Sequence, residues 1–245
     1  MVRAEPRLSS EEAAPPAVSL RAVSFAWPGQ ENPVLHIPEL TIKAGERLFI
    51  FGPSGSGKST LLGLLSGVLT ASEGEVSVQG TALHKLGGAA RDRFRGDHVG
   101  VIFQQFNLVP YLSILENVLI PCRFSARRAA RAARQAGSAA LAARNLLECL
   151  DLRAELWERR VAHLSVGQQQ RVAAARALIG GPELLIADEP TSSLDADRRR
   201  DFLRLLLREC ENSGSTLIFV SHDQGLAAEF SSAANFEELN RRAGR

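Results

Sequence analysis

Residues 52–59 read Gly-Pro-Ser-Gly-Ser-Gly-Lys-Ser. This octapeptide matches the pattern G-x-x-x-x-G-K-S/T of the phosphate-binding loop, here called the P-loop. The apolar run 48–51 before it has the composition of a buried strand, and residues 60–65 after it read as the first turns of a helix. The motif is reliable only between a strand and a helix, so this setting predicts a nucleoside triphosphate site. A glycine-rich turn that binds nothing is the disfavoured alternative.

Each residue type in the loop has a chemical reason to be there. Gly52, Gly55 and Gly57 let the backbone wrap closely around an anion and turn its N–H groups inward. The following helix adds the partial positive charge of its N-terminus. Lys58 is predicted to reach the β- and γ-phosphates, and the Ser59 hydroxyl to bind Mg²⁺. The predicted nucleotide-binding set also includes Pro53, Ser54, Ser56 and Thr60.

Composition excludes several classes of protein. Among 245 residues, 45% are hydrophobic and 23% charged, as in a soluble globular protein, and the net charge of +2 is too small to indicate nucleic-acid binding. The three cysteines show no metal or disulfide spacing, which fits a reducing compartment. Residues 1–16 lack an apolar core, so we expect a disordered tail that is neither signal peptide nor anchor.

The pattern of elements predicts an α/β fold. Residues 18–103 are expected to be mostly strands around one helix, with strands at 18–25, 35–42, 48–51, 74–78 and 99–103. The segment from about 107 to 163 is rich in Ala, Leu and Arg and is predicted to be a helical subdomain. Strands and helices then alternate at 168–179, 184–187, 198–211 and 216–220, which indicates a parallel sheet covered by helices.

The arginines between residues 125 and 150 allow two interpretations. They are Arg127, Arg128, Arg131, Arg134 and Arg144, set among alanines. One interpretation is a patch for nucleic acid or lipid headgroups. The favoured one is a solvated helix face, because alanine and arginine are both good formers of exposed helices.

Two carboxylates follow the apolar run 184–187. Asp188 and Glu189 are expected at the carboxyl end of a buried strand, where α/β sheets bind ligands. Asp188 is predicted to hold Mg²⁺, partly through water. Glu189 is the candidate general base that polarises the attacking water. An acidic turn without function is the alternative, and it is weakened by the presence of the P-loop.

A second anion site is predicted at Leu164-Ser165-Val166-Gly167-Gln168. Ser165 is a natural N-cap for the helix that follows, and Gly167 opens its first turn. The stretch resembles the signature motif of the ATP-binding cassette (ABC) ATPases, with Val166 where most members carry glycine. In that family this motif and the P-loop of a second cassette enclose one ATP, and the resemblance assigns Ser165, Gly167 and Gln168 to nucleotide binding.

The same resemblance implies roles for four other residues. Trp27 matches the aromatic that stacks on adenine, although packing against Phe25 is an alternative. Gln104 matches the glutamine that senses Mg²⁺ and the γ-phosphate, so it is assigned to both catalysis and metal binding. Asp195 matches the loop that crosses between subunits, and His222 the switch histidine that contacts the γ-phosphate.

For the whole chain, the resemblance implies a RecA-like P-loop NTPase core with an inserted α-helical subdomain and an N-terminal antiparallel β portion. It covers residues 17–230, and residues 231–245 are set apart as a C-terminal extension that departs from the family. The implied cofactors are ATP and Mg²⁺. The implied partners are a second copy, paired head to tail around two ATP, and an integral membrane permease; no nucleic acid is expected.

Residues 91–118 are similar to the branch that contains lipoprotein-release, macrolide-export and cell-division cassettes. This branch implies a peripheral location on the cytoplasmic face of the membrane. The apolar residues after Gln104 are expected either to dock a permease helix or to cover the subdomain's own core; they are Phe106, Leu108, Pro110, Tyr111 and Leu112. The alternative function is a soluble ABC ATPase acting on ribosomes or DNA, and a small kinase-like enzyme is a third.

Overall fold

The computed structural model describes residues 15–30 and 32–241, so most of the predicted tail lies outside the described residues. The N-terminal part is an antiparallel sheet with strand order β2-β1-β4-β5. Its strands are β1 (Val18–Phe25), β2 (Leu35–Ile42), β4 (Glu73–Val78) and β5 (Thr81–Ala82). Buried residues alternate within each half of β1 and β2, and the alternation shifts by one residue in the middle of each strand.

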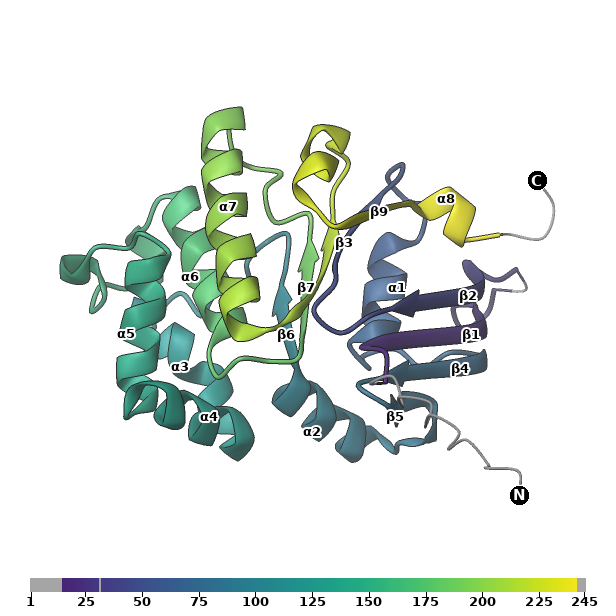
Figure 1. Ribbon diagram of the computed structural model, residues 1–245, viewed down its shortest axis with the longest axis horizontal. Coiled ribbons are helices and arrows are strands. Elements are labelled where there is room, and N and C mark those ends of the chain that lie inside the picture. The colour runs from purple at the N-terminus through teal and green to yellow at the C-terminus, as the bar shows by residue number, and fades with distance from the viewer. Residues whose placement is uncertain (1–14, 31, 242–245) are drawn as a thin grey trace, which may run out of the picture.

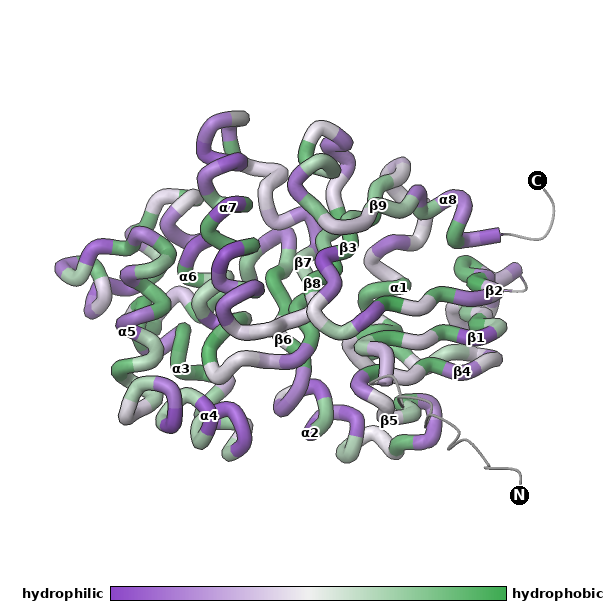
Figure 2. The backbone as a smooth tube through the Cα atoms, in the orientation of Figure 1, coloured by the Kyte–Doolittle hydropathy of each residue, from purple (hydrophilic) through white to green (hydrophobic). Residues whose placement is uncertain are grey.

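The second sheet is parallel throughout, with order β6-β7-β8-β3-β9. Its strands are β3 (Arg47–Phe51), β6 (Val99–Ile102), β7 (Leu184–Asp188), β8 (Thr216–Val220) and β9 (Ser232–Asn235). The central strands are apolar along their length because both faces are covered (Figure 2). Phe49 and Phe219 enter the core shared with the helices, whereas Ile50 and Val220 enter the core shared with the antiparallel sheet and helix α1 (Lys58–Leu65).

The middle of the chain is helical, and Figure 1 shows it beside the parallel sheet on the side away from the antiparallel sheet. It comprises α3 (Ile114–Phe124), α4 (Ala126–Ala136), α5 (Ala139–Cys149) and the short turns η2 (Ala154–Leu156) and η3 (Val161–His163). These elements pack against α6 (Val166–Leu178), while α7 (Ala196–Ser213) covers the sheet next to it. A RecA-like core with an inserted helical subdomain is therefore confirmed.

One prediction about the first part of the chain is wrong. Residues 18–103 contain a second helix, α2 (Gly88–His98), and a short turn η1 (Leu83–Lys85) besides the expected α1. Helix α2 buries only Phe94 and otherwise carries polar, charged and small residues. Such a helix has no apolar periodicity, so the hydrophobic pattern of the sequence does not reveal it.

The arginine-rich helix α4 also differs from its favoured interpretation. Arg128 is 3% exposed and donates hydrogen bonds to the carbonyls of Ile179 (2.7 Å) and Ala177 (2.6 Å) at the end of α6. These carbonyls have no partner within the helix, and the guanidinium caps them. Burial lowers the pKa of Arg128 to about 10, which leaves it charged at neutral pH. The solvated-face interpretation is therefore wrong for this residue.

Glu183, just before β7, joins the side chains of two arginines and a histidine. It accepts from Arg127 (2.7 Å) and His98 (3.0 Å) and forms an ion pair with Arg131. Burial alone disfavours its charge, but these hydrogen bonds outweigh burial and lower the pKa of Glu183 to about 2. This Glu183 cluster ties α2 and α4 to the start of β7, at the amino ends of the parallel strands.

The predicted C-terminal extension contributes to the core sheet. After the turn η4 (Gln224–Glu229), residues 232–235 form β9 at the edge beside β3. The chain then enters α8 (Phe236–Leu239), and Phe236 is fully buried. Within residues 15–30 and 32–241, no helix combines the length and apolar character needed to cross a bilayer.

Candidate active site

The predicted site residues follow four neighbouring parallel strands at the ends where those strands stop. The P-loop follows β3, His222 follows β8, Asp188 ends β7 and Gln104 follows β6. Because the carboxyl ends of parallel strands lie on one edge of a sheet, the fold brings these segments together (Figure 1). Residues that are more than a hundred positions apart in the sequence thus become neighbours because their strands are adjacent in the sheet.

The P-loop ends at Gly57, which is the N-cap of α1 with φ +113°, a conformation that side-chain-bearing residues rarely adopt. The N–H groups of the first helical turn have no partners within the helix, which makes this end an anion site. Lys58 is 6% exposed, and its ammonium donates to the carbonyls of Gly52 (2.9 Å) and Pro53 (2.7 Å). A cavity of about 630 Å³ lies against residues 53–56 and α8.

Ser59 and Asp188 are in direct contact across the site. The Ser59 hydroxyl donates to the Asp188 carboxylate at 2.9 Å. Burial raises the pKa of Asp188, and neighbouring Glu189 adds to this, while the Ser59 hydrogen bond and Lys58 oppose it. In the described part of the chain, no three His, Cys, Asp or Glu side chains gather as a metal site. The hydroxyl–carboxylate pair nevertheless fits Mg²⁺, which prefers oxygen ligands and keeps part of its water shell.

Glu189 and His222 form the second contact pair. The Glu189 carboxylate lies 3.0 Å from Nδ1 of His222, and the two side chains are 19% and 61% exposed. Glu189 has φ +43°, and its N–H donates to the Val220 carbonyl (2.9 Å). A positive φ at a residue with a side chain is strained and tends to occur at functional sites. Glu189 thus combines a strained backbone with a carboxylate in contact with the imidazole.

Two predicted residues stand apart from these pairs. Gln104 is exposed beyond β6, and its side chain makes no hydrogen bond to any described residue. Trp27 is 41% exposed and meets Phe25 edge to face, with ring centroids 5.0 Å apart. The packing alternative therefore holds for one edge of the indole, while much of the ring stays accessible. Thr60 lies half-buried in the first turn of α1.

The signature segment begins a helix as predicted. Ser165 is the N-cap of α6 and forms a capping box with Gln168: the Gln168 N–H donates to the Ser165 hydroxyl (3.4 Å), and the Ser165 N–H to the Gln168 side chain (3.0 Å). Ser165 and Gly167 line a cavity of about 280 Å³ with Leu194 and the first turns of α7. Asp195 caps α7 through the Arg198 N–H (3.0 Å). The P-loop residues line a different cavity.

Sequence reasoning missed Arg199. Its guanidinium donates to the Leu194 carbonyl (3.0 Å) and forms an ion pair with Asp223. It therefore connects the loop before Asp195 to the segment that carries His222. The only signal was a basic residue one turn after Asp195, but residues 198–200 are all arginine, so the pattern could not select one of them.

The apolar segment after Gln104 divides between the two predicted roles. Phe106 is 7% exposed and belongs to the helical core, as the covering role requires. Tyr111 is 71% exposed and is accessible to a partner, as is Phe103, which precedes Gln104 and is 42% exposed. The two alternatives thus apply to different residues of the same segment.

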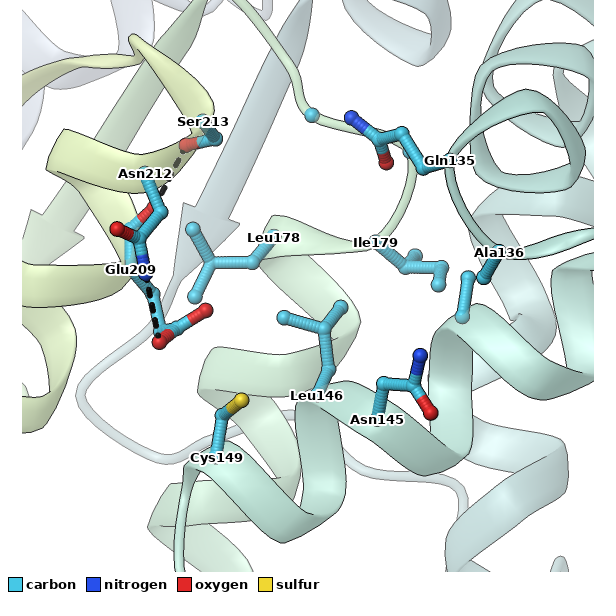
Figure 3. Close-up of a pocket in the computed structure, with 13 residues that line it drawn as sticks. Gln135, Ala136, Asn145, Leu146, Cys149, Leu178, Ile179, Glu209, Asn212 and Ser213 are labelled. Carbon is cyan, nitrogen blue, oxygen red and sulfur yellow. Dashed lines mark hydrogen bonds between the residues drawn. The ribbon is translucent and has the colours of Figure 1, made fainter.

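A further cavity of about 220 Å³ lies between α5, α6 and α7. Figure 3 shows Leu146 and Leu178 pointing toward each other in the middle of this site, with Glu209 and Cys149 beside them. It contains none of the predicted site residues. The cysteines are all free: Cys210 is buried, Cys122 partly buried and Cys149 exposed.

Comparison with known proteins gives the class of this fold and site. The family model described as "ABC transporter" matches residues 35–192. The chain is 46% identical over 193 residues to the Escherichia coli K12 protein named "Uncharacterized ABC transporter ATP-binding protein YbbA", covering 78% of this chain and 80% of that one. It is 40% identical over 220 residues to the "Lipoprotein-releasing system ATP-binding protein LolD" of Anaeromyxobacter dehalogenans, covering 89% of each.

A solved structure of MJ0796, a protein of Methanocaldococcus jannaschii, superposes with a TM-score of 0.77 at 36% identity, covering 89% of this chain and 93% of that one. That structure is a dimeric post-hydrolysis state of the cassette bound to ADP and Pi. The chain belongs to the ABC transporter ATPases. It is an ATP-binding and ATP-hydrolysing cassette of the branch that includes lipoprotein-release and macrolide-export proteins.

Proposed function

We propose that two copies of this chain pair head to tail, and that each ATP lies between the P-loop of one copy and the Ser165–Gln168 helix start of the other. The observation that carries the proposal is that the two anion-binding helix starts of a single chain line separate cavities. The dimeric, ADP-bound state of the MJ0796 cassette supports the same arrangement.

A buried amide adds support on the signature side. Gln170 is fully buried, lines the cavity beside Ser165 and Gly167, and has neither polar atom bonded to a described residue. An unpartnered buried amide is costly, so this cavity favours a polar occupant such as water or a group from the second copy. Ser165 and Gly167 therefore line a cavity in which the Gln170 amide needs a further hydrogen-bond partner.

The P-loop side binds the nucleotide itself. The Trp27 ring stacks on the base, and the backbone and Lys58 bind the phosphates. Ser59, Asp188 and Gln104 are the residues that would hold Mg²⁺, which neutralises charge on the phosphates when bound. Lys58 has only to exchange two loop carbonyls for phosphate oxygens, a substitution that keeps its charge hydrogen-bonded.

Hydrolysis is assigned to the Glu189–His222 pair. The Glu189 carboxylate accepts a proton from the attacking water, whose oxygen forms a bond to the γ-phosphorus while the bond to the β-phosphate oxygen breaks. ADP and phosphate are the products. His222, 3.0 Å from Glu189, orients the carboxylate and contacts the γ-phosphate. Loss of phosphate removes charge that both copies share, so the pair separates.

The test is Ser165→Arg. The substitution fills the signature-side pocket, so the isolated chain should bind ATP normally while turnover falls by about 100-fold or more. Ser138→Arg is the matched control, because the Ser138 side chain also caps a helix, α5, but lines neither cavity. Normal turnover in Ser165→Arg would exclude the shared site.

We further propose that the cassette drives a separate membrane permease and is held at the cytoplasmic face of the membrane through it. The exposed Phe103 and Tyr111 support a docking surface around Gln104. Co-expressed with its neighbouring genes, the protein should sediment with membranes, and Tyr111→Asp should release it while Arg144→Asp should not. Recovery with ribosomes or DNA instead would favour the alternative function.

A further inference from the structure

The C-terminal segment lies directly against the P-loop. Strand β9 runs parallel to β3, with Asn235 beside Phe51, so helix α8 begins at the same sheet edge as the loop (Figure 1). Asn235 caps α8 by accepting from the Glu237 N–H (3.0 Å). The family model ends at residue 192 and does not reach this segment.

Phe236 supports both ends of the loop. A Cβ added at Gly52 would lie 3.1 Å from the Phe236 Cβ, and one added at Gly57 would lie 3.6 Å from its ring. The ring is fully buried. Phe236 thus leaves little room for a side chain at Gly52, whereas at Gly57 it lies at ordinary contact distance and Leu35, 3.0 Å from an added Cβ, is the tighter neighbour.

Asn240, at the end of α8, connects the loop to the antiparallel sheet. It is 7% exposed. Its Oδ1 accepts from the His36 N–H (2.7 Å), and its Nδ2 donates to the carbonyls of Val34 (3.0 Å) and Ser56 (3.4 Å). One amide has one acceptor and two donor hydrogens, and all are used here, so the surrounding groups also fix which side of the amide is oxygen.

The segment that Asn240 contacts is hydrogen-bonded to the strand that precedes Trp27, the residue proposed to stack on the base. The Val34 N–H donates to the Phe25 carbonyl (2.8 Å), and Leu35 pairs with Phe25, two residues before Trp27. Asn240 therefore spans the two parts of the proposed nucleotide site: the strand ends that carry Trp27, and the P-loop at Ser56.

We infer that Asn240 is a positioning residue that fixes the base-binding aromatic at a set distance from the phosphate loop. The inference rests on the proposed nucleotide site. A ligand that bridges both parts gains affinity when they are held in register beforehand, because less freedom is lost on binding. A ligand that contacts only the loop gains little, since the loop is also supported by Phe236 and by the Lys58 bonds.

The experiment compares ATP with inorganic tripolyphosphate, which has the phosphates but no base, by titration calorimetry with Mg²⁺ on the purified chain. Asn240→Asp keeps the shape and the acceptor but directs a carboxylate at two carbonyls, so ATP binding should weaken by about tenfold. Asn240→Ala should weaken it by about fivefold. Tripolyphosphate binding should change by less than about twofold in both variants, a split that general damage to the fold would not produce.

Controls separate this inference from the proposed site. Glu238→Ala changes an exposed residue of the same helix and should bind both ligands normally. Lys58→Ala should lose both ligands, and equal binding by that variant would overturn the nucleotide site itself. If Lys58→Ala behaves as expected but the Asn240 variants bind ATP like the wild type, or lose both ligands equally, the positioning role alone is excluded.

Discussion

In the parallel sheet, acidic residues have different surroundings at the carboxyl ends of the strands (the carboxyl edge) and at their amino ends (the amino edge). At the carboxyl edge, Asp188 and Glu189 each have one close polar side-chain partner, Ser59 and His222 respectively. At the amino edge, the carboxylate of Glu183 is shared by two arginines and a histidine. Groups with spare bonding capacity are available to a ligand, whereas saturated groups hold elements in place. We therefore assign the chemistry to the carboxyl edge and the attachment of the helical subdomain to the amino edge.

The substitution with the largest expected effect is Glu189→Gln, which tests whether the chemistry lies at the carboxyl edge. The amide cannot accept a proton from water, so we expect turnover to fall by about a thousandfold while ATP binding is kept. The trapped nucleotide should give a dimer on gel filtration. Glu211→Gln, on the exposed side of α7, should leave turnover unchanged. A monomer with normal turnover would show that Glu189 is not the base.

The next largest effect is expected at Arg128. Arg128→Met removes the guanidinium and leaves buried carbonyls at the end of α6 without a partner, which should lower the free energy of unfolding by about 3 kcal/mol. Urea unfolding measures this, with Arg134→Met, an exposed residue of the same helix, as the control. ATP affinity below the unfolding temperature should be unchanged, and a selective loss of affinity would contradict the division between edges.

The smallest effect concerns the Glu183 cluster and pH. The folded-state pKa of Glu183 is about 2, below its ordinary value of 4.5. Its contribution to stability is thus complete above pH 4.5 and is lost as pH falls toward 2. Since the carboxylate is 23% exposed, we expect only about 1 kcal/mol after solvent screening.

Glu183→Gln should remove this contribution near pH 7. Between pH 4.5 and 2, the difference in unfolding free energy between wild type and variant should then shrink. A difference that stays constant across that range would show that the charge on Glu183 does not stabilise the fold.

Much of the fold followed from the sequence because its strands are short, apolar and flanked by turns. Strands 18–25, 35–42 and 216–220 have the predicted bounds. Helix α2 could not be predicted, because one large apolar side chain in eleven residues gives no periodicity. The burial of Arg128 was equally hidden, since its acceptors lie 49 and 51 residues away.

For the candidate site, motifs identify residues but not their contacts. Nothing local to Ser59 indicates a hydrogen bond to Asp188, which is 129 residues away. The Asn240 contacts span 184 to 206 residues and occur in a segment that departs from the family pattern. Both sets of contacts depend on the order of the strands in the sheets. Because strand order is a property of the whole chain, a local motif cannot predict these contacts.

The distribution of thiols has a practical consequence. Cys210 is buried, and burial raises its pKa to about 12, so it will resist alkylation; Cys122 is partly covered, and burial raises its pKa too. Cys149 is exposed and lines the cavity between α5 and α7 (Figure 3). Burial raises the pKa of the Cys149 thiol as well, but its exposure should make it the preferred site for a maleimide dye. Its fluorescence would follow, in real time, any change in spacing between the helical subdomain and the core during a turnover cycle.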